Sequence, residues 1–212
     1  MIIFTCQEAW DLHLKGASEN PKWMEDSKQI SEELPISKRE LFGLLVLARI
    51  ANKLSKSEDW YVGYDPTASE PNDGFISDAT NRIDIEHKLV PQMTPQDVLC
   101  AIISTYEKYA AKGDGYGNNR TLIIYANKAS KGQARISDLG EKIKESSCPF
   151  DSVILVAAAS IKQDINTVVI HATEHYPKKG MAQVDLNMTD GSSTVSFSDL
   201  ESLQELVNKK VK

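Results

Sequence analysis

A chain of 212 residues, of which 41% are hydrophobic and 25% charged, is expected to fold as one globular domain that covers 1–212. Its net charge of −6 argues against a protein that coats nucleic acid over a broad basic surface. No apolar run approaches the ~20 residues of a membrane span, and the N-terminus carries no basic leader, so we expect a cytoplasmic protein without a membrane partner.

The first 36 residues are mixed in character, with a short helix expected at 7–14 and a turn at Asn20-Pro21. Ser37 and Glu40 then have the spacing of a capping box, in which each side chain bonds to the backbone N–H group of the other residue. They predict the start of a helix that runs to about residue 54 and buries one leucine-rich stripe.

The later elements follow from period-2 alternation, apolar runs and turn residues. Strands are expected at 60–64, 74–77, 82–90, 120–127, 152–159 and 167–172, and helices at 94–112 and 137–146. Three neighbouring strands followed by a helix that crosses to a further strand indicate a mixed central sheet flanked by helices, which is the α/β class. Within the tail, 177–212, strands are expected at 182–188 and 193–197, with a helix from about residue 198.

The strand expected at 82–90 alternates between apolar and polar residues. One face carries Ile83, Ile85, His87 and Leu89, and the other carries Asp84, Glu86 and Lys88. Asp73 lies upstream of them, on a turn beside a glycine at the start of the preceding strand. Two carboxylates and an ammonium group therefore share one strand face, and a third carboxylate lies on the neighbouring strand.

These residue types are the ones that a divalent-metal phosphodiesterase requires. Asp73 and Glu86 supply carboxylate oxygens, which Mg²⁺ and Mn²⁺ prefer, and the backbone carbonyl of His87 would be a further oxygen ligand. A metal-bound water would be the nucleophile because the metal lowers its pKa. Lys88 would hold that water or offset the charge that develops at the phosphate. We therefore predict Asp73, Glu86 and Lys88 as catalytic residues and Asp73, Glu86 and His87 as metal ligands.

The segments 71–74 and 86–88 resemble the PD-(D/E)xK nuclease superfamily, whose members have the restriction-endonuclease-like fold. In that family a first acid precedes a strand that ends in (D/E)-x-K. Asp73 matches the first acid, Glu86 the second acid and Lys88 the lysine. The Pro-Asp pair of the family is Asn-Asp here, with a proline one residue earlier.

The resemblance implies an αβββαβ restriction-endonuclease-like core at about 37–172, where the order of the expected elements matches the family. The segments 1–36 and 177–212 would then be additions to this core. The resemblance also implies a Mg²⁺-dependent nuclease that hydrolyses phosphodiester bonds of nucleic acid, with DNA as the favoured substrate. Many relatives act as dimers, so a homodimer is left open.

Three further acids are weaker candidates for the site. Asp84 shares a face with Glu86, where it is either a third metal contact or, as we favour, a flanking residue. Members of the superfamily sometimes use a glutamate from the first helix, which makes Glu40 and Glu33 candidates. Helix capping already explains Glu40.

A basic and polar segment follows the strand expected at 120–127. Its residues Lys128, Lys131 and Gln133 are predicted to contact backbone phosphates, which positions nucleic acid without reading its sequence. A solvated loop explains the same residues equally well.

Other function classes remain open, because the motif residues also have plain structural explanations. Glu86 and Lys88 fit a solvated strand face, and Asp73 fits a turn. The chain would then be a non-catalytic binding or regulatory protein of the immunity type on a nuclease-like fold, or an unrelated sheet protein.

Overall fold

The computed structural model describes residues 1–15, 28–65, 73–90, 95–110, 120–126, 139–145, 148–162, 164, 166–198, 205 and 207. Within these residues one sheet contains nine strands, which lie side by side in chain order. The strands are β1 (Ile2–Thr5), β2 (Tyr61–Tyr64), β3 (Gly74–Ser77), β4 (Arg82–Val90), β5 (Arg120–Ala126), β6 (Ser152–Lys162), β7 (Thr167–Tyr176), β8 (Gly180–Asn187) and β9 (Ser193–Ser198). The helices are α1 (Cys6–Ala9), α2 (Lys38–Ser55), α3 (Pro95–Ala110) and α4 (Leu139–Glu145), and a π-helical turn, η1 (Trp10–Leu14), follows α1.

The direction of pairing changes twice across the sheet. Strands β1 to β4 pair antiparallel to one another. Strands β4, β5 and β6 are parallel, and the segments that contain α3 and α4 make the crossover connections that parallel neighbours need. Strands β6 to β9 are antiparallel again. The expected α/β class, the mixed sheet and the element order from α2 to β7 are confirmed.

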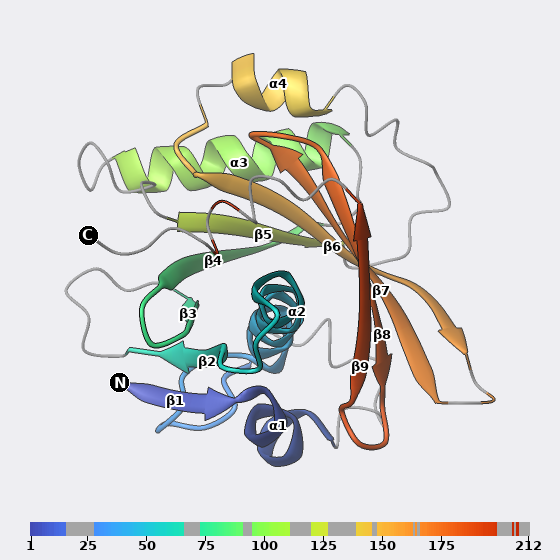
Figure 1. Cartoon of the computed structure of the whole chain (residues 1–212). Coiled ribbons are helices and arrows are strands. Elements are labelled where there is room, and N and C mark those ends of the chain that lie inside the picture. Colours follow the sequence, from blue (N-terminus) through green and yellow to red (C-terminus); the bar gives the residue numbers. More distant parts are fainter. Residues whose placement is uncertain are drawn as a thin grey trace.

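The sheet curves around α2, and α3 and α4 lie on its opposite face (Figure 1). Each face buries its own core. On the α2 side, Ile85 of β4 and Ile123 of β5 belong to one cluster of buried residues. On the other side, Leu122 and Ile124 of β5 pack in a second cluster that includes residues of α3 and α4. Strand β5 is therefore buried on both faces, which explains its nearly continuous apolar sequence.

Helix α2 begins with the predicted capping box. Ser37 Oγ accepts a hydrogen bond from the Glu40 amide at 3.2 Å, and Glu40 Oε2 accepts one from the Ser37 amide at 2.7 Å. The helix ends at Lys56, which adopts the left-handed conformation. The predicted buried stripe is confirmed, and residues on other sides of the helix are buried as well. A helix enclosed by a curved sheet needs apolar residues on several sides.

The N-terminal segment and β7 differ from the expectation. Strand β1 was not expected, and it pairs with β2 at one edge of the sheet. The helix expected at 7–14 begins earlier, at Cys6, because Thr5 and Glu8 form a capping box there. Strand β7 continues beyond its expected end to Tyr176, since it pairs with both neighbours along its length.

The two strands expected in the tail are present as β8 and β9, and both belong to the same sheet as the rest. The last helix was expected to start at about residue 198, which is instead the final residue of β9, and 199–204 lie outside the described residues. Among the described helices, none is long and apolar enough to cross a membrane.

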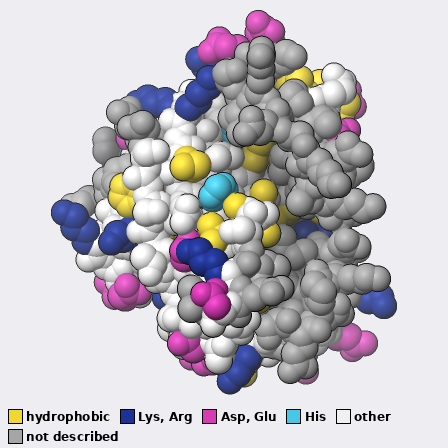
Figure 2. All heavy atoms as spheres, turned by 90° about the vertical axis from the view of Figure 1, so that its right-hand side faces the viewer, with side chains coloured by type: hydrophobic (Ala, Val, Ile, Leu, Met, Phe, Trp, Pro, Cys, Tyr) yellow, Lys and Arg dark blue, Asp and Glu magenta, His cyan; other side chains and the backbone are white. Residues whose placement is uncertain are grey.

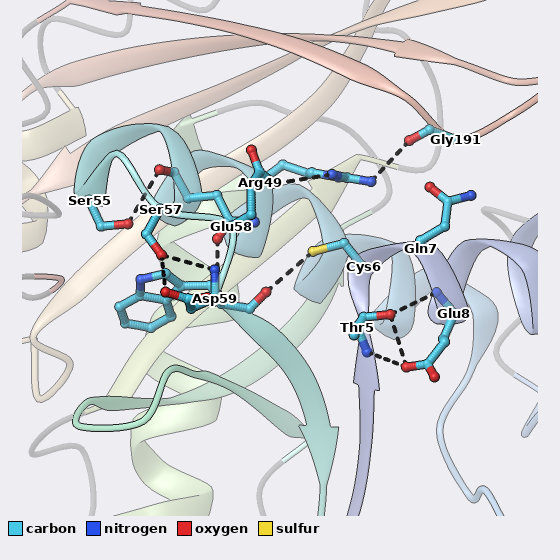
Figure 3. Close-up of polar contacts among 12 residues, drawn as sticks. Thr5, Cys6, Gln7, Glu8, Arg49, Ser55, Ser57, Glu58, Asp59 and Gly191 are labelled. Atoms are coloured by element: carbon cyan, nitrogen blue, oxygen red, sulfur yellow. Dashed lines mark hydrogen bonds and ion pairs between the residues drawn. The ribbon is translucent and has the colours of Figure 1, made fainter.

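Polar contacts join the N-terminal segment and the β8–β9 turn to the second half of α2 (Figure 3). Cys6 Sγ donates to the Trp60 carbonyl at 3.7 Å, and the Trp60 amide donates to Asn52 Oδ1 at 2.9 Å. Arg49 Nη2 donates to the Gly191 carbonyl at 3.3 Å. These bonds fix the C-terminal half of α2.

Gly191→Ala is expected to destabilise the protein by about 2–4 kcal/mol, through a strained backbone and a crowded core. Gly191 has a φ of +72°, and an added Cβ would lie 2.2 Å from Cγ of Trp10. Urea unfolding of the wild type and the variant measures the change. The control is Ser192→Ala, which removes only an exposed hydrogen bond to Asp190 and should cost less than about 1 kcal/mol. Equal stability of the two variants would contradict the prediction.

Candidate functional site

Asp73 reaches β4 at the start of β3, through an irregularity in the sheet. Its amide donates to the Ile85 carbonyl at 3.1 Å, and its Oδ2 accepts a hydrogen bond from the His87 amide at 2.7 Å. The Asp73 side chain thus takes the place that a backbone carbonyl has in a regular ladder. Its carboxylate is held at the amide of the residue between Glu86 and Lys88, so the structure brings these three predicted site residues to neighbouring backbone positions.

Gly74 makes this irregularity feasible. Its φ is +143°, a conformation that residues with a side chain rarely adopt. An added Cβ would also lie 2.5 Å from Cδ1 of Leu44 on α2. Glycine is therefore required both for the local backbone and for the close approach of α2.

The two faces of β4 have the residues that the alternation predicted. Ile83 and Ile85 are buried on the α2 side. Glu86 is aligned with Leu122 of β5, which packs on the α3 side, so Glu86 points to that side. Lys88 has the same parity as Glu86 and is half-buried, and it makes no ion pair with any described residue.

Glu86 is buried in an ion pair, which the sequence did not indicate. Its side chain is 2% exposed, and its Oε1 accepts a hydrogen bond from Nη1 of Arg120 at 2.8 Å. The guanidinium is 6% exposed. A solvated strand face is therefore the wrong description of Glu86, because Arg120 at the start of β5 supplies the positive charge that lets the carboxylate be buried.

His87 lies on the α2 side of β4, as the alternation predicted. Its Nδ1 is 2.9 Å from the hydroxyl of Tyr125, and the two rings stack with centroids 5.6 Å apart. Burial lowers the pKa of His87 to about 3, and the nearby charge of Arg39 lowers it further in the same direction. The imidazole is thus neutral at physiological pH.

Two acids and one cation shift the pKa of Tyr125. Burial raises the pKa of Tyr125 well above its usual value, the carboxylates of Glu40 and Asp73 raise it further, and Arg39 opposes them. Gly43 permits the close approach of this hydroxyl to α2, since an added Cβ would overlap it at 1.5 Å. We call the group formed by these side chains the α2–β4 polar cluster; its members are Arg39, Glu40, Asp73, His87 and Tyr125.

The weaker candidates have structural partners or lie away from β4. Glu40 caps α2 through Oε2, and its charge also raises the pKa of Tyr125. Glu33 is exposed on the segment before α2. Asp84 Oδ1 accepts a hydrogen bond from Nε of Arg82 at 2.8 Å, which agrees with a flanking residue. These contacts keep Asp73 and Glu86 as the principal acids.

Only two of the described acids, Asp73 and Glu86, remain candidates to hold a divalent cation. Among the described residues, no group of three or more His, Cys, Asp or Glu side chains has the geometry to bind a metal. Mg²⁺ keeps several waters and needs only one or two carboxylates, so Asp73 and Glu86 would be sufficient. Both carboxylates also have hydrogen-bond donors, the His87 amide and Arg120, of the kind that orient metal-binding carboxylates. In residue type and in their donors, Asp73 and Glu86 therefore suit such an ion.

The predicted phosphate contacts of Lys128, Lys131 and Gln133 lie within 127–138, outside the described residues. Figure 2 shows the side of the molecule on which β7 to β9 lie. Among the described residues on that side, Lys and Arg side chains are interspersed with Asp and Glu, and no continuous basic surface is visible. One ion pair of this region, between Lys162 and Asp185, joins β6 to β8 at 2.7 Å.

Three residues of the site were missed from the sequence: Arg39, Arg120 and Tyr125. Arg120 is the one charged residue of an apolar strand, which was the only available signal. The chain matches no protein-family model, no curated protein and no solved structure. Its function is therefore inferred from the contacts of Asp73, Glu86 and Lys88.

Proposed function

We propose that this protein is a metal-dependent phosphodiesterase that cleaves nucleic acid, with DNA as the favoured substrate. The observation that supports this most strongly is the bond between the Asp73 carboxylate and the His87 amide, because it joins the first acid to the Glu86-His87-Lys88 segment. The order of α2, the antiparallel strands β2 to β4, α3 and the parallel strand β5 also suits an αβββαβ restriction-endonuclease-like core.

In the proposed mechanism, Asp73 and Glu86 would hold Mg²⁺ or Mn²⁺ through their carboxylate oxygens, and the His87 carbonyl would be a further oxygen ligand. When bound, the ion would lower the pKa of a water molecule and stabilise negative charge on the phosphate. Lys88 orients the attacking water or neutralises the charge that develops in the transition state. No covalent intermediate with the protein is required.

The neighbours of the two acids fix their orientation in this proposal. The His87 amide holds one oxygen of Asp73, and Arg120 holds one oxygen of Glu86. A carboxylate with one oxygen fixed by a donor can present the other to a cation with little loss of conformational entropy. Arg120 is therefore a positioning residue, since its hydrogen bond is to Glu86.

Two observations favour the alternative of a non-catalytic binding or immunity-type protein on the same fold. Arg120 already balances the charge of Glu86 in a buried pair, and a purely structural role would explain that pair. The net charge of −6 also favours a protein that does not bind a long stretch of nucleic acid. Metal binding separates these alternatives, because a structural pair does not require a cation.

We expect Mn²⁺ to bind to the wild type and to lose at least about 10–100-fold in affinity in the double variant Asp73→Asn/Glu86→Gln, which is the loss seen when even an indirect partner of a metal is removed. Isothermal titration calorimetry measures this. Asp185→Asn is the control, because it removes a carboxylate on β8 that is paired with Lys162. Equal affinity of wild type and double variant would refute the metal site.

A further inference from the structure

Arg39 is a buried cation for which the proposed catalytic mechanism has no use. It is the second residue of α2 and is 7% exposed. Its Nε and Nη1 atoms are buried, and neither has a hydrogen-bond partner among the described residues. Buried donors of a charged group are costly when they have no acceptor, because they have lost their hydration and gained no hydrogen bond in exchange. Such an unsatisfied group calls for an explanation.

The place of Arg39 in the helix increases this cost. The N-terminus of α2 carries the positive end of the helix dipole, which disfavours a cation and favours an anion. The first amides of a helix also lack intrahelical acceptors, so they can donate to a ligand. An anion bound beside Arg39 would neutralise the buried charge and would interact favourably with the helix dipole.

The contacts of α2 indicate which side of the helix Arg39 lies on. Gly43 is one helical turn after Arg39 and faces Tyr125 and His87, with an added Cβ placed 1.5 Å from the tyrosine hydroxyl and 3.1 Å from Cε1 of His87. The Arg39 charge acts on both of these residues. His87 Nε2 is likewise buried without a hydrogen-bond partner in the described residues. Unsatisfied polar atoms from α2 and β4 therefore converge in the α2–β4 polar cluster.

The acids of that cluster do not satisfy Arg39. Asp73 Oδ2 is bonded to the His87 amide, and Glu40 Oε2 is bonded to the Ser37 amide. Within the described residues, neither acid forms an ion pair with the arginine. A bridging water would satisfy N–H groups but would not neutralise the charge. Among the described residues, no acid pairs with the guanidinium, which leaves it available to an anion from outside the chain.

We propose that Arg39 binds a backbone phosphate of the nucleic acid, next to Asp73, through its Nε–H and Nη1–H groups. The planar guanidinium presents adjacent N–H donors in a fork that matches two phosphate oxygens. The positive end of α2 adds favourable potential for the same group. This inference rests on the proposed function for its ligand, and it makes Arg39 the group that holds the phosphate on the α2 side of β4, near Asp73.

The test measures by fluorescence anisotropy how tightly the wild type and its variants bind a short fluorescein-labelled DNA duplex. The buffer contains Ca²⁺, and gel electrophoresis shows that the probe stays intact. Arg39→Gln should weaken binding about tenfold or more, as loss of a charged hydrogen-bonding group does. Lys38→Gln is the matched control, because it removes the same charge from the neighbouring residue of α2. Lys38 acts electrostatically on His13, away from the polar cluster, and its variant should bind within about threefold of wild type.

Wild-type affinity in Arg39→Gln overturns the inference, and so does an equal loss in Arg39→Gln and Lys38→Gln, which would indicate general attraction. Absence of duplex binding by the wild type also overturns it. If Arg39→Gln does not fold, Arg39→Lys decides, since lysine keeps the charge but lacks the fork. A loss of threefold or more in that variant supports the proposal, and wild-type affinity refutes it.

A second arm separates backbone phosphate from free phosphate. Inorganic phosphate at millimolar concentration should change the Tm of the wild type and of Arg39→Gln equally if the site requires the polymer. Stabilisation of the wild type alone, without duplex binding, would assign the site to free phosphate and refute the nucleic-acid ligand. The failure of the proposed function is distinct: a wild type that binds the duplex through Arg39 but never cleaves it in Mg²⁺ is a binding protein, for which the Arg39 inference still holds.

Discussion

Lys88→Met is expected to reduce cleavage of DNA in Mg²⁺ by about 10²–10³-fold, because that is the usual cost of removing one preorganised electrostatic group from an active site. Stability should change by no more than about 0.5 kcal/mol, since Lys88 is half-buried and makes no ion pair with any described residue. Methionine keeps most of the side-chain volume, so packing against β5 is retained. Plasmid cleavage and thermal melts of the same preparations measure the two effects.

The matched control is Lys162→Met. Lys162 is also a strand lysine, but it lies on β6 in an ion pair with Asp185 and away from Asp73. Loss of this exposed pair should cost at most about 1 kcal/mol and leave cleavage unchanged. If Lys88→Met cleaves as well as Lys162→Met, the nuclease assignment is wrong, and the non-catalytic alternative replaces it.

The start of α2 and the two faces of β4 could be predicted from local sequence signals. The capping box of Ser37 and Glu40 gives the start of α2, because its hydrogen bonds join residues three apart in the sequence. The alternation in β4 separates Ile85 and His87 from Glu86, since side-chain direction in a strand depends only on residue parity. Both predictions are confirmed because they need no knowledge of distant residues.

The surroundings of the acids depend on contacts that are distant in sequence, and these were not predicted. Arg120 is 34 residues from Glu86, and only the parallel register of β4 and β5 brings the two side chains together. The position of the Asp73 carboxylate likewise depends on the register of β3 against β4. Arg39 gave no signal, because a basic residue at a helix start is ordinarily solvated. Burial of the helix end by the curved sheet makes it unusual.

The curvature of the sheet also explains why the two sides of β4 differ chemically. The α2 side encloses a helix and holds the neutral His87 against Tyr125. The α3 side holds the charged pair of Glu86 and Arg120. Asp73, at the irregular start of β3, touches the backbone of β4 between them, so a ligand bound to Asp73 is near residues of both sides.

Arg120→Met is expected to destabilise the metal-free protein by about 3–5 kcal/mol, because it leaves the Glu86 carboxylate buried without its partner. Glu86→Gln/Arg120→Met should recover most of this loss, since it removes the buried charge as well. Urea unfolding in EDTA of the wild type, both single variants and the double variant gives the coupling energy. A loss below about 1 kcal/mol in Arg120→Met would show that the pair is not structurally required.

The same variants test whether Glu86 binds a metal. Arg120→Met removes the guanidinium beside Glu86, and a bound Mn²⁺ would restore positive charge there. Mn²⁺ should therefore stabilise this variant more than it stabilises the wild type, because it binds the folded variant more tightly. Glu86→Gln/Arg120→Met has no charged acid at that position and should gain less than Arg120→Met. Equal stabilisation of all three proteins by Mn²⁺ would mean that Glu86 is not a ligand. The Glu86–Arg120 pair would then be structural, and Asp73 alone would be too weak a site for the proposed chemistry.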